Sequence, residues 1–154
     1  MMRFLELKVP PVLVVAIAAA LMWLTAWALP ATNLALPGRI PATILAALAG
    51  GVFAVAGIVE FRRARTTTNP LKPANASSLV RGGIYKLTRN PMYFGMALLL
   101  LAWGIYLSNP VCLAVLFAFV AYMNRFQILP EEKALDALFG DEFAAYRKSV
   151  PRWI

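Results

Sequence analysis

The sequence contains no histidine and only one cysteine, Cys112. Without imidazole, the chain lacks the most common general base of neutral-pH hydrolysis and the most common protein ligand for metals. One cysteine cannot form an intrachain disulfide or a cysteine-based zinc site. We therefore expect no metal centre, and we expect Cys112, which lies within an apolar run, to be a buried small apolar residue.

Charge is also scarce, because 14% of the 154 residues are charged whereas 61% are hydrophobic. Apolar residues make up about half of a soluble domain, so this composition indicates a chain that lies in a bilayer. The net charge is +8, but a soluble nucleic-acid-binding protein would not carry long apolar stretches. We therefore expect no nucleic-acid partner, and we expect the basic residues to set the membrane orientation.

Four apolar stretches predict an all-α integral membrane protein with four transmembrane helices in a single domain, 1–154. Each stretch approaches the roughly 20 residues that cross a bilayer as a helix. Between the second and third stretches, residues 62–90 contain seven basic residues and no acid, whereas residues 31–39 contain one basic residue. The basic loop and both termini are therefore predicted to be cytoplasmic, as in a prokaryotic inner membrane protein. The predicted spans are 10–29, 40–61, 91–107 and 110–129, with a cytoplasmic loop at 62–90 and a cytoplasmic tail at 130–154.

Two local patterns predict how these segments pack. Small residues between Ala46 and Gly57, including adjacent glycines at 50 and 51, favour close approach of the second span to another helix. In the tail, Pro130 is predicted to open an amphipathic helix that ends at Gly140, followed by a second short helix at 141–149. Ser108, Asn109 and Pro110 predict a tight turn between the last two spans.

Polar residues gather at one end of the third and fourth spans. Adjacent antiparallel helices bring these ends to the same depth, so the sequence predicts a polar pocket beneath a lipid-accessible surface. The residues concerned are Tyr85, Arg89, Asn90 and Tyr93 on one side and Asn124, Arg125, Gln127 and the glutamates 131 and 132 on the other.

Several ordered motifs resemble the isoprenylcysteine carboxyl methyltransferase family and its bacterial relatives, which are related to the phospholipid methyltransferases. They are the runs 79–85 (LVRGGIY), 89–95 (RNPMYFG), 130–132 (PEE) and 150–153 (VPRW), with Leu135, Phe139, Gly140, Phe143 and Tyr146 between the last two. The resemblance covers about the C-terminal half of the chain.

The resemblance implies an integral membrane enzyme that uses S-adenosylmethionine and a lipophilic substrate entering from the bilayer. The cytoplasmic loop and the C-terminal amphipathic helices would form the cofactor site. Carried over by position, the cofactor-binding residues are Ser77, Ser78, Leu79, Val80, Tyr85, Asn90, Pro91, Met92, Tyr93 and Glu131, with Thr68 and Asn69 as additional candidates.

The candidate catalytic residues are Glu132, Arg89, Arg125 and Gln127. In the eukaryotic isoprenylcysteine enzymes, histidine stands at the position of Asn90, and an arginine that holds the substrate carboxylate stands at the position of Gln127. Arg125 is a candidate substitute for that arginine. The acceptor therefore stays open between an isoprenylcysteine-like carboxylate, a lipid amine and a thiol, with Glu132 or Glu131 as the nearest proton acceptor.

The chemistry of these residues suits S-adenosylmethionine. Its ammonium needs an acid, its carboxylate needs donors, and its sulfonium and adenine favour aromatic faces. Glu131, Asn90, Tyr85 and Tyr93 supply these groups. Methyl transfer is an in-line displacement that depends on orientation and desolvation, so the lack of histidine does not oppose it.

Two other functions remain open from the sequence. Membrane sterol reductases carry a similar Arg-His-Pro-Asn-Tyr run and bind a nicotinamide cofactor, although this chain is short for that fold. A small non-enzymatic four-helix transporter of basic lipophiles is the second alternative. A transporter of that kind would be expected to carry an acid within a span, whereas the candidate acids here lie at the edges of the spans.

Overall fold

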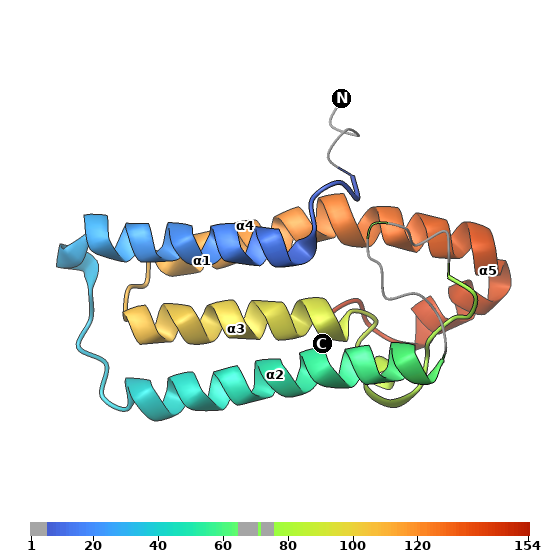
Figure 1. The fold of residues 1–154 in the computed structure, drawn as a ribbon, viewed down its shortest axis with the longest axis horizontal. Helices are drawn as coiled ribbons and strands as arrows, with labels where there is room; N and C mark the ends of the chain where they lie inside the picture. The colour runs from blue at the N-terminus through green and yellow to red at the C-terminus, as the bar shows by residue number, and fades with distance from the viewer. Residues whose placement is uncertain (1–5, 65–70, 72–75) are drawn as a thin grey trace.

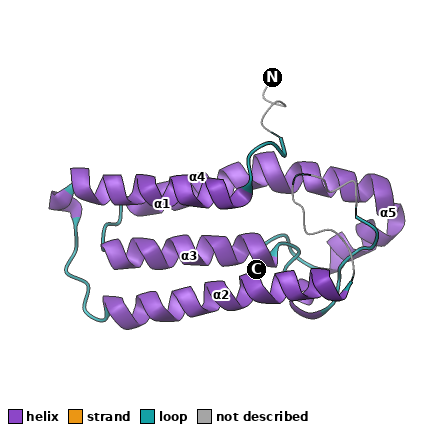
Figure 2. Cartoon of the chain, viewed as in Figure 1, coloured by secondary structure: helices purple, strands orange, loops and turns teal. Residues whose placement is uncertain are grey.

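A computed structural model describes residues 6–64, 71 and 76–154, so the candidates Thr68 and Asn69 lie outside the described residues. The described chain is helical and contains no strand (Figure 2). Its elements are α1 (Pro11–Ala28), the 3-10 turn η2 (Pro30–Thr32), α2 (Arg39–Arg63), the 3-10 turn η4 (Gly83–Lys86), α3 (Pro91–Leu107), α4 (Cys112–Tyr122), the π-helix η5 (Met123–Ile128) and α5 (Leu129–Ser149).

The helices α1 to α4 run side by side, and α3 packs against the other three (Figure 1). The α1–α2 and α3–α4 connections lie together at one end, on the left in Figure 1, which we call the distal end. The loop that precedes α3 and the helix α5 lie at the opposite end, which we call the pocket end.

Within the described residues, three helices are long and apolar enough to cross a membrane, namely α1, α2 and the continuous helix that begins at Cys112. The predicted third span, α3, is apolar but has 17 residues and falls below that length. Large apolar side chains such as Val12 and Leu45, 69% and 71% exposed, point outward from α1 and α2. A bilayer covers such a surface and water does not, so the chain is an integral membrane protein.

The small residues of α2 pack against α3, as predicted. A Cβ atom added to Gly50 would lie 2.8 Å from the carbonyl oxygen of Gly95, and one added to Gly95 would lie 2.6 Å from that of Gly50. The two backbones are therefore in direct contact. Gly51, by contrast, has nothing within 4 Å of an added Cβ, so only one of the two adjacent glycines serves this contact.

We expect Gly50→Ala to destabilise the protein by about 1–3 kcal/mol, because the new methyl group must push two backbones apart. Gly51→Ala is the matched control and is expected to be neutral or slightly stabilising, because alanine favours the helix. Thermal unfolding in detergent measures both changes. Equal melting temperatures for the two variants would contradict the direct backbone contact.

The structure corrects the predicted helix start at Pro130, because the helix continues from Cys112 through η5 into α5. Proline has no N–H to donate to the carbonyl four residues earlier, which belongs to Phe126. The N–H of Leu7 donates to that carbonyl instead, at 3.0 Å. The π-helical turn Met123–Ile128 lies just before Pro130. The helix continues past the missing hydrogen bond, from Cys112 to Ser149.

Gly140 ends the straight part of this helix, as predicted. Its φ and ψ values of 46° and −119° are not helical, and a positive φ favours glycine. The second part of α5 turns back toward the helices at this residue (Figure 1). Phe143 and Tyr146 are thereby buried in a small cluster with Leu79 and Leu135.

The predicted turn at the distal end is also present, with Ser108 in the left-handed conformation at φ 55°. The amide of Asn109 donates to Thr32 Oγ1 at 2.7 Å and to Asn33 Oδ1 at 2.8 Å. These bonds join the two distal connections. Cys112 is buried beside them, 1% exposed, which confirms the expectation for this residue.

Candidate active site

A largely apolar pocket with a few polar groups lies at the pocket end, between the loop that precedes α3 and the first part of α5. Residues from four separate parts of the chain meet there. They are Phe61 from α2, Ala76, Ser78, Leu79, Val80 and Tyr85 from the loop, Arg89, Asn90, Met92 and Tyr93 around the start of α3, and Ile128, Glu131, Glu132, Leu135, Phe143 and Tyr146 from η5 and α5.

Glu131 is a partly buried acid of this pocket. It lies beyond the apolar stretch of its helix, and burial raises its pKa to about 8, with the nearby Glu132 adding to the rise. The hydroxyl of Tyr93 donates a hydrogen bond of 2.6 Å to its Oε1 and opposes this rise. A carboxyl group held in this way is suited to receive a cation, because a positive charge would restore the stability of its ionised form.

Tyr85, which also lines the pocket, is held in place through its ring and through its backbone. The ring of Phe61 meets the Tyr85 ring edge-on, with 5.5 Å between centroids, and the Tyr146 hydroxyl donates to the Tyr85 carbonyl at 2.7 Å. Burial raises the pKa of the Tyr85 hydroxyl well above its usual value, and the neighbouring Tyr146, Glu131 and Glu60 add to this. The hydroxyl therefore stays protonated and can donate a hydrogen bond.

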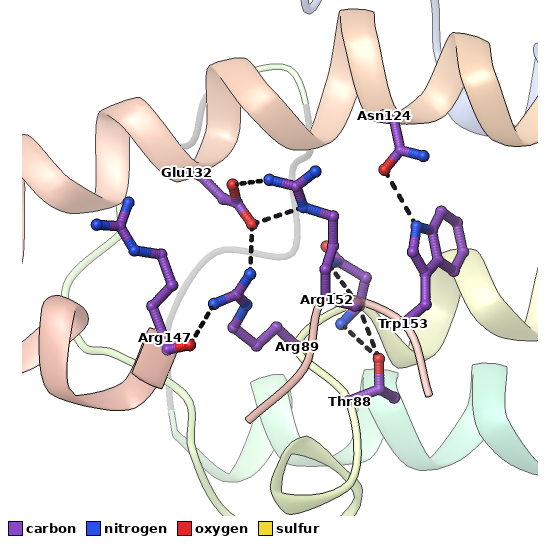
Figure 3. Close-up of polar contacts among 8 residues, drawn as sticks. Thr88, Arg89, Asn124, Glu132, Arg147, Arg152 and Trp153 are labelled. Atoms are coloured by element: carbon purple, nitrogen blue, oxygen red, sulfur yellow. Dashed lines mark hydrogen bonds and ion pairs between the residues drawn. The ribbon is translucent and has the colours of Figure 1, made fainter. Parts of the chain in front are cut away.

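Glu132 is held by two arginines (Figure 3). Its Oε1 accepts from Arg89 Nη2 at 2.9 Å and from Arg152 Nε at 3.0 Å, and its Oε2 accepts from Arg152 Nη2 at 2.6 Å. The side chains of Arg89 and Glu132 are only 9% and 11% exposed. One negative charge thus faces two positive charges, and this cluster has one positive charge in excess.

Arg89 has an unused donor at the pocket. Its Nη1 donates to the Arg147 carbonyl at 3.0 Å, but its Nε is buried and has no hydrogen-bond partner within the described parts of the chain. Burial lowers the pKa of the Arg89 guanidinium, although Glu132 opposes this. An anionic ligand would satisfy both the free donor and the excess charge.

The C-terminal residues 150–153 form a strap across the start of α3 (Figure 3). The carbonyl of Arg152 accepts from Thr88 Oγ1 at 3.0 Å and from Asn90 Nδ2 at 2.9 Å. Trp153 Nε1 donates to Asn124 Oδ1 at 3.0 Å. The strap therefore holds the loop, α3 and η5 together and presents Arg152 to Glu132.

Most of the residues singled out from the sequence lie around this one pocket. The structure brings together Ser78, Leu79, Val80, Tyr85, Arg89, Asn90, Met92, Tyr93, Glu131 and Glu132. Within this set, the amide nitrogen of Asn90 is already engaged with the strap, because it donates to the Arg152 carbonyl.

Four predicted site residues do not line the pocket, namely Ser77, Pro91, Arg125 and Gln127. Pro91 begins α3 and is buried. Arg125 pairs with Glu6 at 2.7 Å on the surface, because the N-terminal segment crosses η5. Gln127 is fully buried and donates to the Val9 carbonyl at 2.6 Å, so it holds the same segment. The two residues thus contact the N-terminal segment.

Sequence reasoning did not place Phe61, Leu135, Phe143 and Tyr146 in the pocket, although all four line it. Phe143 and Tyr146 are three residues apart, just after Gly140. This spacing puts them on one face of a helix, and a glycine-induced turn is the signal that directs that face back toward the loop. Phe61 carries no comparable signal, because it continues the apolar pattern of α2.

Comparison with known proteins shows the family of this chain. The family model for phospholipid methyltransferases matches residues 39–142, and the chain belongs to this family. It is 32% identical to the protein-S-isoprenylcysteine O-methyltransferase A of Arabidopsis thaliana over 104 residues, which cover 67% of this chain and 52% of the relative. It is also 32% identical to the mouse protein-S-isoprenylcysteine O-methyltransferase over 78 residues, covering 51% of this chain and 28% of the relative.

An uncharacterised Haemophilus influenzae protein is 40% identical over 63 residues, which cover 41% of this chain and all of that protein. The relatives confirm the resemblance to the isoprenylcysteine methyltransferases. The chain spans about half or less of the length of the methyltransferases described above. No solved structure matches the chain.

Proposed function

We propose that the protein is an S-adenosylmethionine-dependent methyltransferase that acts on a lipophilic acceptor. The observation that carries this proposal is the Glu131 carboxyl, hydrogen-bonded to Tyr93 in a pocket at the end of apolar helices. Support also comes from the family match over residues 39–142 and from methyltransferase relatives.

The residues of the pocket fit the groups of this cofactor. Glu131 is suited to the ammonium, and the rings of Tyr85 and Tyr93 are suited to cationic groups. Arg89 Nε, buried and without a partner in the described chain, is suited to a carboxylate. The cofactor supplies a methyl group on a sulfonium, and the protein's part is to orient the acceptor and exclude water. Phe61, Leu79 and Leu135 supply the apolar walls.

We propose that Glu132 positions the arginines and does not act as the general base. Both of its oxygens already accept hydrogen bonds from guanidinium groups, so the carboxylate is held in place between the two arginines. Arg89 and Arg152 together carry the excess positive charge, so we propose that a carboxylate, of the cofactor or of the acceptor, binds beside them. We further propose that the acceptor enters from the bilayer, because the pocket lies at the end of apolar helices with large exposed apolar side chains, and that the pocket end is cytoplasmic.

Calorimetric titration of the purified protein in detergent tests the cofactor. We expect S-adenosylmethionine and S-adenosylhomocysteine each to bind and to raise the melting temperature. Turnover is then compared between N-acetyl-S-farnesylcysteine and its methyl ester, which has the same tail but no free carboxylate. Binding of a reduced nicotinamide cofactor in place of both methionine derivatives would contradict the proposal and favour a reductase.

A further inference from the structure

A second, open groove lies in the distal half of the molecule, between α2 and α3 and away from the active-site pocket. It is lined by Thr43, Ala47, Leu99, Ala102, Trp103 and Tyr106. Trp103 and Tyr106 stack with 5.5 Å between ring centroids, and Trp103 Nε1 is held by the Ala19 carbonyl at 3.1 Å. The groove therefore has a fixed aromatic wall and an apolar floor.

One charged residue lies next to this groove, against its Tyr106 ring. Arg39 is the only charged residue between positions 9 and 59, and there is none between positions 90 and 124. The Arg39 guanidinium lies over the Tyr106 ring, 5.8 Å from the centroid, and donates a long hydrogen bond of 3.4 Å to Ser108 Oγ. Most of its donors are thus left for another partner, because a guanidinium carries five N–H groups.

Thr43 provides a second polar group one helical turn further along α2. Its Oγ1 is buried, and no residue that the structure describes forms a hydrogen bond with it. A threonine hydroxyl within a helix commonly bonds the carbonyl of the preceding turn, but this one does not. The spacing of four residues puts Arg39, Thr43 and Ala47 on one face of the helix, so charge, hydroxyl and apolar surface follow one another along the groove.

We propose that this groove binds one anionic phospholipid from the leaflet at the distal end, with its phosphate at Arg39 and an acyl chain along the apolar floor. An arginine with unused donors matches a phosphodiester in charge and geometry, and Trp103 and Tyr106 are residues typical of the membrane interface. The Thr43 hydroxyl donates to an oxygen of the same headgroup region. The proposal concerns a site distinct from the pocket and does not depend on methyl transfer.

Native mass spectrometry and thermal unfolding of delipidated protein in detergent test this site. We expect dioleoyl phosphatidylglycerol to bind saturably as a single copy and to raise the melting temperature more than dioleoyl phosphatidylcholine does. Arg39→Gln is expected to lower phosphatidylglycerol affinity by about tenfold or more, the effect of losing a charged hydrogen bond. Arg62→Gln, at the other end of the same helix and exposed, is the matched control and is expected to change little.

Two further variants separate the parts of the site. Thr43→Val keeps the shape of the side chain and is expected to weaken phosphatidylglycerol binding by a few fold. Ala47→Leu fills the floor of the groove and is expected to weaken the binding of both lipids. Glycerol 3-phosphate, which has no acyl chain, is expected not to compete. Equal stabilisation by the two lipids, non-saturating binding, or equal losses for Arg39→Gln and Arg62→Gln would each overturn the proposal.

Discussion

Glu131→Gln is expected to lower the affinity for S-adenosylmethionine by at least about tenfold, because the amide keeps the size of the side chain but not its charge. A hydrogen bond to a charged group contributes about 1.5–3 kcal/mol, and a tenfold change in affinity corresponds to about 1.4 kcal/mol. Isothermal titration calorimetry measures the change. Asp136→Asn, an exposed acid one turn further along α5, is the control and is expected to bind normally.

The pH dependence of binding identifies the same group. The pKa of Glu131 is raised to about 8 in the free protein, and a bound cation lowers it, so binding at lower pH must first remove a proton. Affinity is therefore expected to rise by about tenfold from about pH 6.5 to about pH 8 in the native protein. Subtracting the profile of Glu131→Gln removes any titration of the ligand itself. Parallel profiles for the two proteins would exclude Glu131 as the cation-binding acid.

Tyr93→Phe refines this test, because the Tyr93 hydroxyl donates to Glu131 at 2.6 Å and holds its pKa down. Without that hydrogen bond, the pKa of Glu131 is expected to rise further. The pH at which affinity levels off then moves upward, while affinity at high pH changes less than it does in Glu131→Gln.

Glu132→Gln is expected to cost about 3 kcal/mol of folding stability, because it leaves two nearby arginines without their shared carboxylate. Removing one partner of a buried ion pair costs about 3–5 kcal/mol, and Arg152, 33% exposed, regains part of its hydration. Thermal unfolding in detergent measures the loss. The control is Arg81→Gln, which breaks a pair with Glu142 that is 50% and 47% exposed, and it is expected to change stability by less than about 1 kcal/mol.

The same variant separates the two roles considered for Glu132. If it positions the arginines, stability and cofactor affinity fall together, and Glu132→Asp restores part of both. A variant that folds with native stability and binds the cofactor normally but does not turn over would contradict the positioning role and restore Glu132 as the proton acceptor.

The sequence predicts the helices well where local signals mark their ends. The predicted third span, 91–107, coincides with α3 because proline opens it and Ser108 ends it in a left-handed conformation. The predicted start of a separate helix at Pro130 is wrong for a non-local reason. Proline signals an interruption of the helix, but the carbonyl it frees is satisfied by the N–H of Leu7, and no local pattern predicts that partner.

The site residues also divide into those that local motifs predict and those that they do not. Tyr93 and Glu131 were predicted to contribute to one site because each lies within a motif, and they do lie together in the pocket. The sequence predicts Arg89 and Glu132 in one pocket, but it does not predict that Arg152 also pairs with Glu132, because nothing near residue 132 indicates which of the 15 lysines and arginines faces it. Arg152 belongs to the VPRW motif, and its contact with Glu132 depends on how the strap crosses α3. Gln127 was expected at the pocket, but the π-helical turn lies beside the N-terminal segment, which Gln127 contacts.

The strap also determines when the active site forms during synthesis. Thr88 and Asn90 bond the carbonyl of Arg152, 64 and 62 residues later in the chain, so these contacts join segments made far apart in time. Helices form in microseconds or less, whereas the ribosome adds about 5–20 residues per second. Thr88 and Asn90 are therefore made seconds before Arg152, and until Arg152 is made the Glu132 carboxylate lacks the second of its two arginines. A chain stopped before residue 150 would contain all of the helices but not the strap that joins Thr88, Asn90 and Glu132.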